Sequence, residues 1–167
     1  TIGSNVTSIG VKAFAWCTNL ESITIPESVT DTGEYAFAGC GNLSSANIPS
    51  RVTRIEEGVF SNCALTDIII PEGVTYIGSS AFLGCRLTSV TIPNNVNFIG
   101  IYAFTCHGLK DFYCTPTIPP TIEDMFYDAI GQGQNLNIHV PTNSVDDYKG
   151  AGGWWSAYAE HIVDGGF

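Results

Sequence analysis

One sequence phrase recurs five times along the chain, at intervals of 22 or 23 residues. The copies open at Val6, Val29, Val52, Val74 and Val96. The fullest copy keeps these fixed positions: Val74, Ile77, Gly78, Ala81, Phe82, Cys85, Leu87, Val90, Ile92 and Pro93. A unit this short cannot bury a core by itself, so successive units must stack and share one. The repeat therefore predicts a solenoid.

The second half of each unit reads as a short strand with one buried face. Leucine and two later aliphatic residues, each set followed by proline, occur at 20–25, 43–48, 65–70 and 87–92. Residues 109–114 keep the pattern without the proline. Equivalent strands of successive units should pair in parallel, about 4.8 Å apart. They would form one wall of the solenoid.

The first half of each unit predicts the opposite wall. A glycine at Gly10, Gly33, Gly78 and Gly100 should permit an unusual backbone turn. A short helical or 3-10 turn should follow and point the Ala-Phe pair inward. Unit three has Glu56 in place of the glycine. The glycine is therefore useful at this repeat position but not obligatory.

Residues of about 118–141 repeat the phrase in a lengthened and degenerate form. Ile122, Phe126 and the strand ending at 136–141 stand where the period places them. The extra residues fall at 114–120 and 131–135. We therefore predict a solenoid over residues 1–141, with a sixth unit as its last layer.

Residues 142–167 predict a small helical cap over the last open core face. Asn143 or Ser144 suits the N-cap of a first helix, whose first turn is acidic. The glycines at 150–153 should end that helix, and 154–162 should form a second one.

At the other end, Thr1-Ile2-Gly3 aligns with the strand ending Thr24-Ile25-Pro26. We therefore expect the sequence to begin inside a repeat. Either the earlier residues were removed or the sequence was cut from a longer array, and we favour the second. We expect any targeting signal to lie outside it.

The repeat resembles the bacterial leucine-rich repeats of the BspA-like family, also called type 5 leucine-rich repeats. The resemblance rests on Val-Thr-Ser-Ile-Gly-Val-Lys-Ala-Phe-Ala-Trp-Cys at 6–17 and Leu-Thr-Ser-Val-Thr-Ile-Pro at 87–93, with their counterparts. It covers nearly the whole chain. It implies an α/β solenoid wound as a right-handed superhelix, with a parallel β-sheet on one face, short helical or 3-10 turns on the other and a small C-terminal helical cap.

The resemblance also extends to the C-terminus and to function. The Val-Pro, Asp-x-Tyr-Lys and Gly-Trp segments of residues 140–154 are similar to family endings, which implies a natural C-terminus close to Phe167. The adhesive roles of the family imply an extracellular or cell-surface location and a host or bacterial surface or matrix protein as the partner.

Two kinds of side chain recur at one repeat position each and should form ladders in the core. The phenylalanine ladder comprises Phe14, Phe37, Phe60, Phe82, Phe104 and Phe126, and the cysteine ladder comprises Cys17, Cys40, Cys63, Cys85 and Cys106. Stacked cysteines lie within disulfide reach, but parallel side chains fit the required dihedral angle poorly. We favour buried free thiols that act as small hydrophobic groups, Cys114 included, over disulfides.

Composition and spacing argue against several classes of function. The net charge of −10 repels nucleic acid. No apolar run reaches the roughly 18 to 20 residues of a membrane helix. His107, His139 and His161 lie far apart, without a metal-ligand motif or a catalytic motif around them. We predict no enzymatic activity, no metal and no cofactor.

Binding is then expected at the outward positions of the strands, on the extended surface that repetition creates. These positions are Ser22, Thr24, Ser45, Asn47, Asp67, Ile69, Ser89, Thr91, Asp111 and Tyr113. Serine and threonine also suit any exposed sheet. The most informative candidates are therefore Asp67, Ile69, Asp111 and Tyr113, which make the face acidic and aromatic toward its C-terminal end.

Three functions remain open. The first is a non-enzymatic surface or secreted module that recognises and adheres to proteins. The second is a glycan-binding module of a polysaccharide-capturing surface protein, for which Trp154 and Trp155 would supply an exposed aromatic pair. One or both tryptophans would otherwise plug the end of the core. The third is a passive structural spacer.

Overall fold

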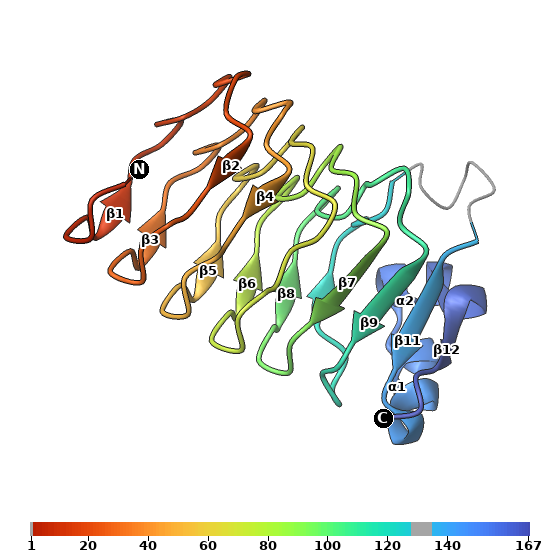
Figure 1. The fold of residues 1–167 in the computed structure, drawn as a ribbon. Coiled ribbons are helices and arrows are strands. Elements are labelled where there is room, and N and C mark those ends of the chain that lie inside the picture. The colour runs from red at the N-terminus through yellow and green to blue at the C-terminus, as the bar shows by residue number, and fades with distance from the viewer. Residues whose placement is uncertain (1, 128–134) are drawn as a thin grey trace.

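The computed structural model describes residues 2–127 and 135–167. The repeats lie side by side as successive coils, and two helices close the C-terminal end (Figure 1). All strand pairs are parallel. The predicted solenoid with parallel sheets and a helical C-terminal end is therefore confirmed. Its right-handed winding stays a prediction.

The predicted strands form one wall, which we call the strand face. It contains β2 (Ser22–Ile23), β4 (Ser45–Ala46), β7 (Ser89–Ile92), β9 (Asp111–Cys114) and β11 (Asn137–Val140), together with residues 65–70. The strand β12 (Ile162–Asp164), which was not predicted, adds to its C-terminal edge. Burial alternates along β7, as expected of a strand with one face on the core. Residues 65–70 were predicted to form a strand but form none.

A second row of short strands was not predicted. It contains β1 (Ser8–Ile9), β3 (Asp31–Thr32), β5 (Arg54–Ile55), β6 (Tyr76–Ile77), β8 (Phe98–Ile99) and β10 (Thr121–Ile122). Each of these strands pairs over two residues, for example Ile77 opposite Ile99. A strand of two residues is too short for alternation to be visible in the sequence.

The turns that follow these short strands form a third wall, which we call the turn wall. No helix is present among residues 2–127, so the expected short helical turns were wrong in detail. Backbone amides there alternate between two acceptors. The Cys17 amide donates to Phe14 in its own unit, whereas the Phe14 amide donates to Ala36 of the next unit. Sharing amides with the next unit prevents a continuous helix.

The repeated glycines act in a different way from the one predicted. None of Gly10, Gly33, Gly78 and Gly100 has a positive φ. A Cβ at Gly33 would lie 2.4 Å from the Val11 nitrogen, and one at Gly78 would lie 2.7 Å from the Glu57 nitrogen. The glycines therefore permit neighbouring units to approach closely.

Both rows of strands are interrupted between units two and three, a junction that we call the seam. On the strand face the gap also includes unit three, which has no strand there. In the second row β1 and β3 form one sheet and β5, β6, β8 and β10 another. On the strand face β2 and β4 are separated from β7, β9, β11 and β12. Only the turn wall crosses the seam, through bonds such as that from the Phe37 amide to Val59. Glu56 replaces the glycine here, and the link from Cys63 to Leu65 is one residue shorter than in units one and two.

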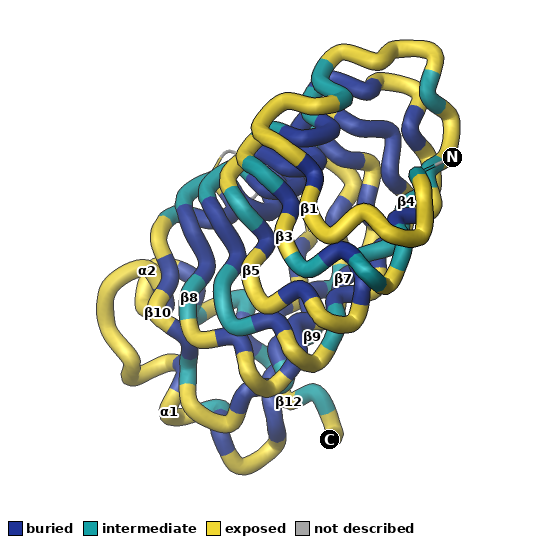
Figure 2. The backbone as a smooth tube through the Cα atoms, turned by 90° about the vertical axis from the view of Figure 1, so that its left-hand side faces the viewer, coloured by how far each residue is buried: buried dark blue, intermediate teal, exposed yellow. Residues whose placement is uncertain are grey.

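The core runs along the inside of the coil, where buried segments follow one another from unit to unit (Figure 2). Five of the predicted phenylalanines form one stack, with ring centroids 5.3 to 5.8 Å apart. The sixth, Phe126, was wrongly placed in this stack. Phe112 packs edge-on between Phe104 and Phe126, with centroid distances of 5.2 and 5.0 Å.

All six cysteines are free thiols, and five of them are buried. Four ladder thiols donate to a phenylalanine carbonyl of the preceding unit, for example Cys63 to Phe37 at 3.2 Å and Cys106 to Phe82 at 3.2 Å. Cys17 is exposed, so its predicted burial was wrong. Units two to five bury the thiol between neighbours, and unit one has no unit before it in this chain.

The repeat pattern continues into β10 and β11. Ile122 lies opposite Ile99 of β8, and Ile138 lies opposite Phe112 of β9. Most of the extra stretch at 131–135 lies outside the described residues. The division into a solenoid ending at residue 141 and a cap stays a prediction.

The C-terminal end consists of the 3-10 turn η1 (Thr142–Ser144), α1 (Val145–Gly150), α2 (Gly153–Ala157), the 3-10 turn η2 (Ala159–His161) and β12. Ser144 occupies the N-cap position of α1, but its side chain accepts no hydrogen bond from the helix. Its hydroxyl instead donates to the Thr117 carbonyl at 3.0 Å. The second helix was predicted to extend to Ile162 but ends at Ala157. Ile162 instead begins β12 and pairs with Ile138 of β11.

Candidate functional site

The predicted binding positions all lie on the strand face, but they differ in how free their side chains are. Ser22, Thr24, Ser45, Ser89 and Thr91 are exposed. Asn47 is half-buried and serves the fold, because its carboxamide accepts from the Ile25 amide at 2.7 Å and donates to the Ile25 carbonyl at 2.9 Å. The Asn47 side chain thus bonds to both backbone groups of Ile25, just after β2, in place of a neighbouring strand.

Asp67 and Ile69 occupy the middle of the strand face. The Ile69 side chain is 79% exposed, although the neighbouring Ile68 and Ile70 are buried. A hollow of about 520 Å³ lies on the side of β4, and one of about 280 Å³ lies on the side of β7. Both are lined by Asp67 and Ile69. Ile69 is therefore an apolar projection between two hollows at the interrupted part of the sheet.

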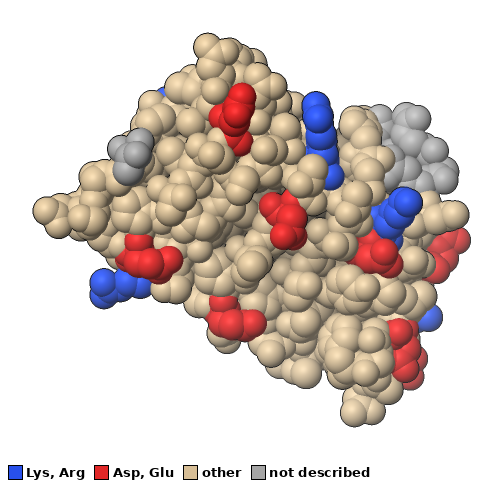
Figure 3. Space-filling model, viewed as in Figure 1, with Lys and Arg blue, Asp and Glu red and all other residues tan. Residues whose placement is uncertain are grey.

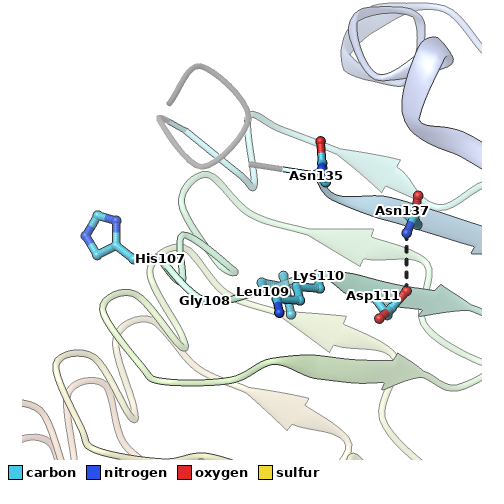
Figure 4. Close-up of a pocket in the computed structure, with 7 residues that line it drawn as sticks. All are labelled: His107, Gly108, Leu109, Lys110, Asp111, Asn135 and Asn137. Atoms are coloured by element: carbon cyan, nitrogen blue, oxygen red, sulfur yellow. Dashed lines mark hydrogen bonds between the residues drawn. The ribbon is translucent and has the colours of Figure 1, made fainter. Parts of the chain in front are cut away.

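Asp111 and Tyr113 belong to a second group, near the C-terminal end of the strand face. Asp111 Oδ1 lies 2.8 Å from His139 Nε2 and accepts a hydrogen bond from the side-chain nitrogen Nδ2 of Asn137 at 3.5 Å. The hydrogen bond with His139 holds the pKa of Asp111 below its usual value. Figure 4 shows Asp111 and Asn137 facing each other across neighbouring strands, while His107 lies apart from them.

A hollow of about 440 Å³ adjoins this group and is lined by residues 107–111 with Asn135 and Asn137. Its polar side-chain groups are an imidazole, an ammonium, a carboxylate and two carboxamides. Such groups bind hydroxyls, amides and charged side chains by hydrogen bonds.

The Tyr113 and His139 rings are stacked, with centroids 4.4 Å apart and planes 13° from parallel. The two residues are directly paired on β9 and β11. Their ring faces therefore point along the sheet toward each other, and their edges point outward. This arrangement offers a partner hydrogen-bonding atoms and ring edges, not a flat aromatic surface.

Asn137 and His139 were missed as site residues. The alternation that placed Asp111 and Tyr113 outward in β9 also places Asn137 and His139 outward in β11. The signal was present in the strand ending at 136–141.

The two tryptophans of the cap have different environments. Trp155 is 3% exposed, and its indole nitrogen donates to the Pro120 carbonyl at 2.8 Å. Trp154 is 45% exposed. The expectation that at least one tryptophan closes the core is confirmed for Trp155, and the alternative of an exposed aromatic pair was wrong.

The acidic and metal-binding side chains of the described residues do not indicate a further binding site. On the face shown in Figure 3, acidic side chains are scattered rather than gathered in one patch. Within residues 2–127 and 135–167, no group of three histidine, cysteine or acidic side chains could hold a metal ion. No helix in these ranges is long and apolar enough to cross a membrane.

Comparison with known proteins agrees with this architecture. The family model for the BspA-type leucine-rich repeat region matches residues 1–110 and 33–148, with six copies. The chain belongs to the BspA-type leucine-rich repeat family. Its repeats thus form a binding or structural module of the kind found in bacterial surface proteins. Among curated proteins, none matches the chain.

Solved structures of bacterial leucine-rich repeat proteins are similar to this BspA-type chain. A protein from Bacteroides ovatus is 34% identical with a TM-score of 0.69, over 83% of this chain and 36% of its own. A T. pallidum leucine-rich repeat protein is 28% identical with a TM-score of 0.66, over 81% of this chain and 62% of its own. The chain thus spans less than two thirds of either protein.

The pneumococcal vaccine antigen PcpA shares the fold at 18% identity, with a TM-score of 0.68. The match covers 98% of this chain and 38% of PcpA.

Proposed function

We propose that this chain is a non-enzymatic recognition module of a cell-surface or secreted protein, which adheres to a host or bacterial protein through its strand face. The observation that carries the proposal is Ile69, an isoleucine left 79% exposed between two hollows on a face of serine, threonine and asparagine. An apolar contact inside a polar rim is typical of protein interfaces.

The group at the C-terminal end extends the same surface. Asp111, Asn137 and the edges of Tyr113 and His139 present acceptors and donors in fixed positions, because they bond to or stack on each other. Fixed polar groups favour orientation and specificity of a bound protein. The outward ring edges make this end less suited to stacking on a sugar.

Family membership supports the location. BspA-type repeats occur in bacterial surface proteins, and PcpA, which shares the fold, is described as a vaccine antigen. An extracellular or surface position would bring the strand face to host or bacterial proteins.

The test is binding of the purified chain to a panel of immobilised extracellular-matrix proteins. We expect at least one to bind, and Ile69→Ser to weaken that binding about tenfold or more, the loss typical of an interface hot spot. Ile118→Ser is the matched control, since Ile118 is 80% exposed but lies outside the strand face. It should bind like the unaltered chain.

Two outcomes would count against the proposal. Failure of every matrix protein to bind would favour a passive spacer. Equal losses in Ile69→Ser and Ile118→Ser would show that the strand face is not the contact surface.

A further inference from the structure

The turn wall carries a tryptophan in a conformation that bulky residues rarely adopt. Trp16 has a φ of 61°, in the left-handed region that costs most residues free energy. Units two and four have Gly39 and Gly84 at the same place, with φ of 73° and 71°. The fold therefore requires the backbone conformation but not the tryptophan. A bulky residue in this strained conformation motivates a hypothesis of function.

The indole of Trp16 lies flat on the next unit. A Cβ added to Gly39 would lie 2.5, 2.7 and 2.9 Å from Cε3, Cδ2 and Cζ3 of the ring. Three ring atoms at such similar distances place Gly39 under the ring face. Trp16 is nevertheless 73% exposed, so its opposite face is open to solvent.

Tyr35 repeats this arrangement one unit further along. Its φ is 56°, and its ring covers Gly58, where an added Cβ would lie 2.3 Å from Cδ1 and Cε1. The Tyr35 hydroxyl donates to the Glu57 carboxylate, which fixes the ring and raises the Tyr35 pKa to about 12. The tyrosine is thus a rigid, neutral neighbour of Trp16.

Trp16 and Tyr35 line a hollow of about 450 Å³, a volume in the range of small-molecule sites. Lys12, Ser61 and Asn62 contribute polar groups to its lining. Lys12 Nζ lies 5.6 Å from the centre of the Tyr35 ring. The side-chain nitrogen Nδ2 of Asn62 donates to the Ser61 hydroxyl at 3.1 Å. The hollow combines a flat apolar surface with an ammonium, a carboxamide and hydroxyl groups.

We propose that this hollow binds a neutral saccharide, with a sugar ring stacked on Trp16. A pyranose has a flat C–H face that matches an aromatic ring and hydroxyls around its edge that match Lys12 and Asn62. The net charge of −10 disfavours an acidic glycan. The site lies on the turn wall, so it is separate from protein recognition by the strand face.

The decisive variant is Trp16→Gly. Glycine already occupies this position in units two and four, so the variant should fold and keep or raise its melting temperature. We expect the unaltered chain to bind neutral oligosaccharides on an array of glucans, galactans, mannans and xylans. Affinity measured by calorimetry should fall about tenfold or more in Trp16→Gly.

Trp154→Ala is the control, because Trp154 is also exposed but lies on the cap. It should keep full saccharide affinity, and saccharide should change the tryptophan fluorescence of Trp154→Ala but not of Trp16→Gly. Absence of binding to every neutral oligosaccharide, unchanged affinity in Trp16→Gly, or capture of a protein through Trp16 alone would overturn the proposal. Matrix-protein binding through Ile69 should survive Trp16→Gly, which keeps the two proposals distinguishable.

Discussion

At the scale of single residues, the ladder cysteines show how position in the stack controls chemistry. Each buried ladder thiol donates to a carbonyl of the preceding unit, as Cys85 does to Phe60 at 3.2 Å. Burial raises the pKa of the thiol to about 12 in Cys106 of the ladder and to about 12 in Cys114, which lies outside the ladder. Because the thiolate is the reactive form, buried cysteines should be inert, while Cys17 is exposed.

We therefore predict that one thiol of the folded chain reacts rapidly with Ellman's reagent at pH 8. A pKa of about 12 leaves only about one thiol in ten thousand ionised at that pH, and burial also blocks access. All six should react after unfolding in guanidinium without reductant. Cys17→Ser should remove the rapid phase. A second rapid thiol would contradict the predicted burial, and fewer than six after unfolding would reveal a disulfide.

Which residues could be predicted depends on whether their role has a sequence period. The Phe and Cys ladders and the outward strand positions recur at every unit, so spacing locates them. The positions with a left-handed backbone have no recurring residue type, so spacing does not locate them. Their non-glycine members are Lys12, Trp16, Tyr35, Asn62, Ser80 and Tyr102. Trp16 and Tyr35 were missed for this reason. The glycines at 39 and 58, one unit later, were the available cue.

At the scale of elements, close contact between units depends on the glycines that follow β3, β6 and β8. Gly78 faces the Glu57 nitrogen of the preceding unit, and Gly100 faces the Ser79 nitrogen, where an added Cβ would lie 2.6 Å away. Real Cβ atoms do not come so close to backbone, so a side chain must push neighbouring strands apart. Gly10, in the first unit, has no atom within 4 Å of its added Cβ.

This difference makes Gly10→Ala a control for Gly78→Ala. We expect Gly78→Ala to lower the free energy of unfolding by about 1–3 kcal/mol, the usual cost of overpacking. Gly10→Ala should be neutral or stabilising by up to about 1 kcal/mol, since it only restricts the unfolded chain. Urea unfolding with a constant m-value measures both. Equal effects would show that close approach is not the reason for the glycine.

The elements themselves were only partly predictable. The spacing of leucine and two later apolar residues located β7 and β9, where the burial of four residues alternates. The same spacing failed at 65–70, which form a ladder with neither β4 nor β7, because strand formation depends on pairing with neighbouring units, which the residues of one unit do not encode. The helical spacing of Trp155, Tyr158 and Ile162 predicted one helix, but parallel pairing of Ile162 with Ile138 ends it. Tertiary pairing overrides local propensity in both places.

At the scale of the whole molecule, the cap closes the last core face with aromatic residues that also have a polar atom to satisfy. Trp155 donates to Pro120, the Tyr148 hydroxyl donates to the Pro116 carbonyl at 2.6 Å, and the Tyr158 hydroxyl donates to Asp124 at 2.7 Å. The Tyr148 and Trp155 rings meet edge-on, with centroids 4.8 Å apart. These contacts join the cap to residues 116–124, within the last repeat.

Units of a solenoid contact mainly their neighbours, so a loss of stability at one end should affect the nearest units first. We predict that Trp155→Ala lowers the free energy of unfolding by about 3–5 kcal/mol, through the lost apolar contact and the cavity. Trp154→Ala, which removes an exposed indole, should change it by less than about 0.5 kcal/mol. Urea unfolding followed by circular dichroism would measure both values.

Hydrogen exchange adds the spatial test of the same variant. In Trp155→Ala, amides of β10 and β11 should exchange faster than in the unaltered chain, while those of β5 and β6 should change less, because they lie several units from the cap. Faster exchange to the same extent in all four strands would mean that the solenoid unfolds as one cooperative body. That result would contradict the view that its stability is passed from neighbour to neighbour.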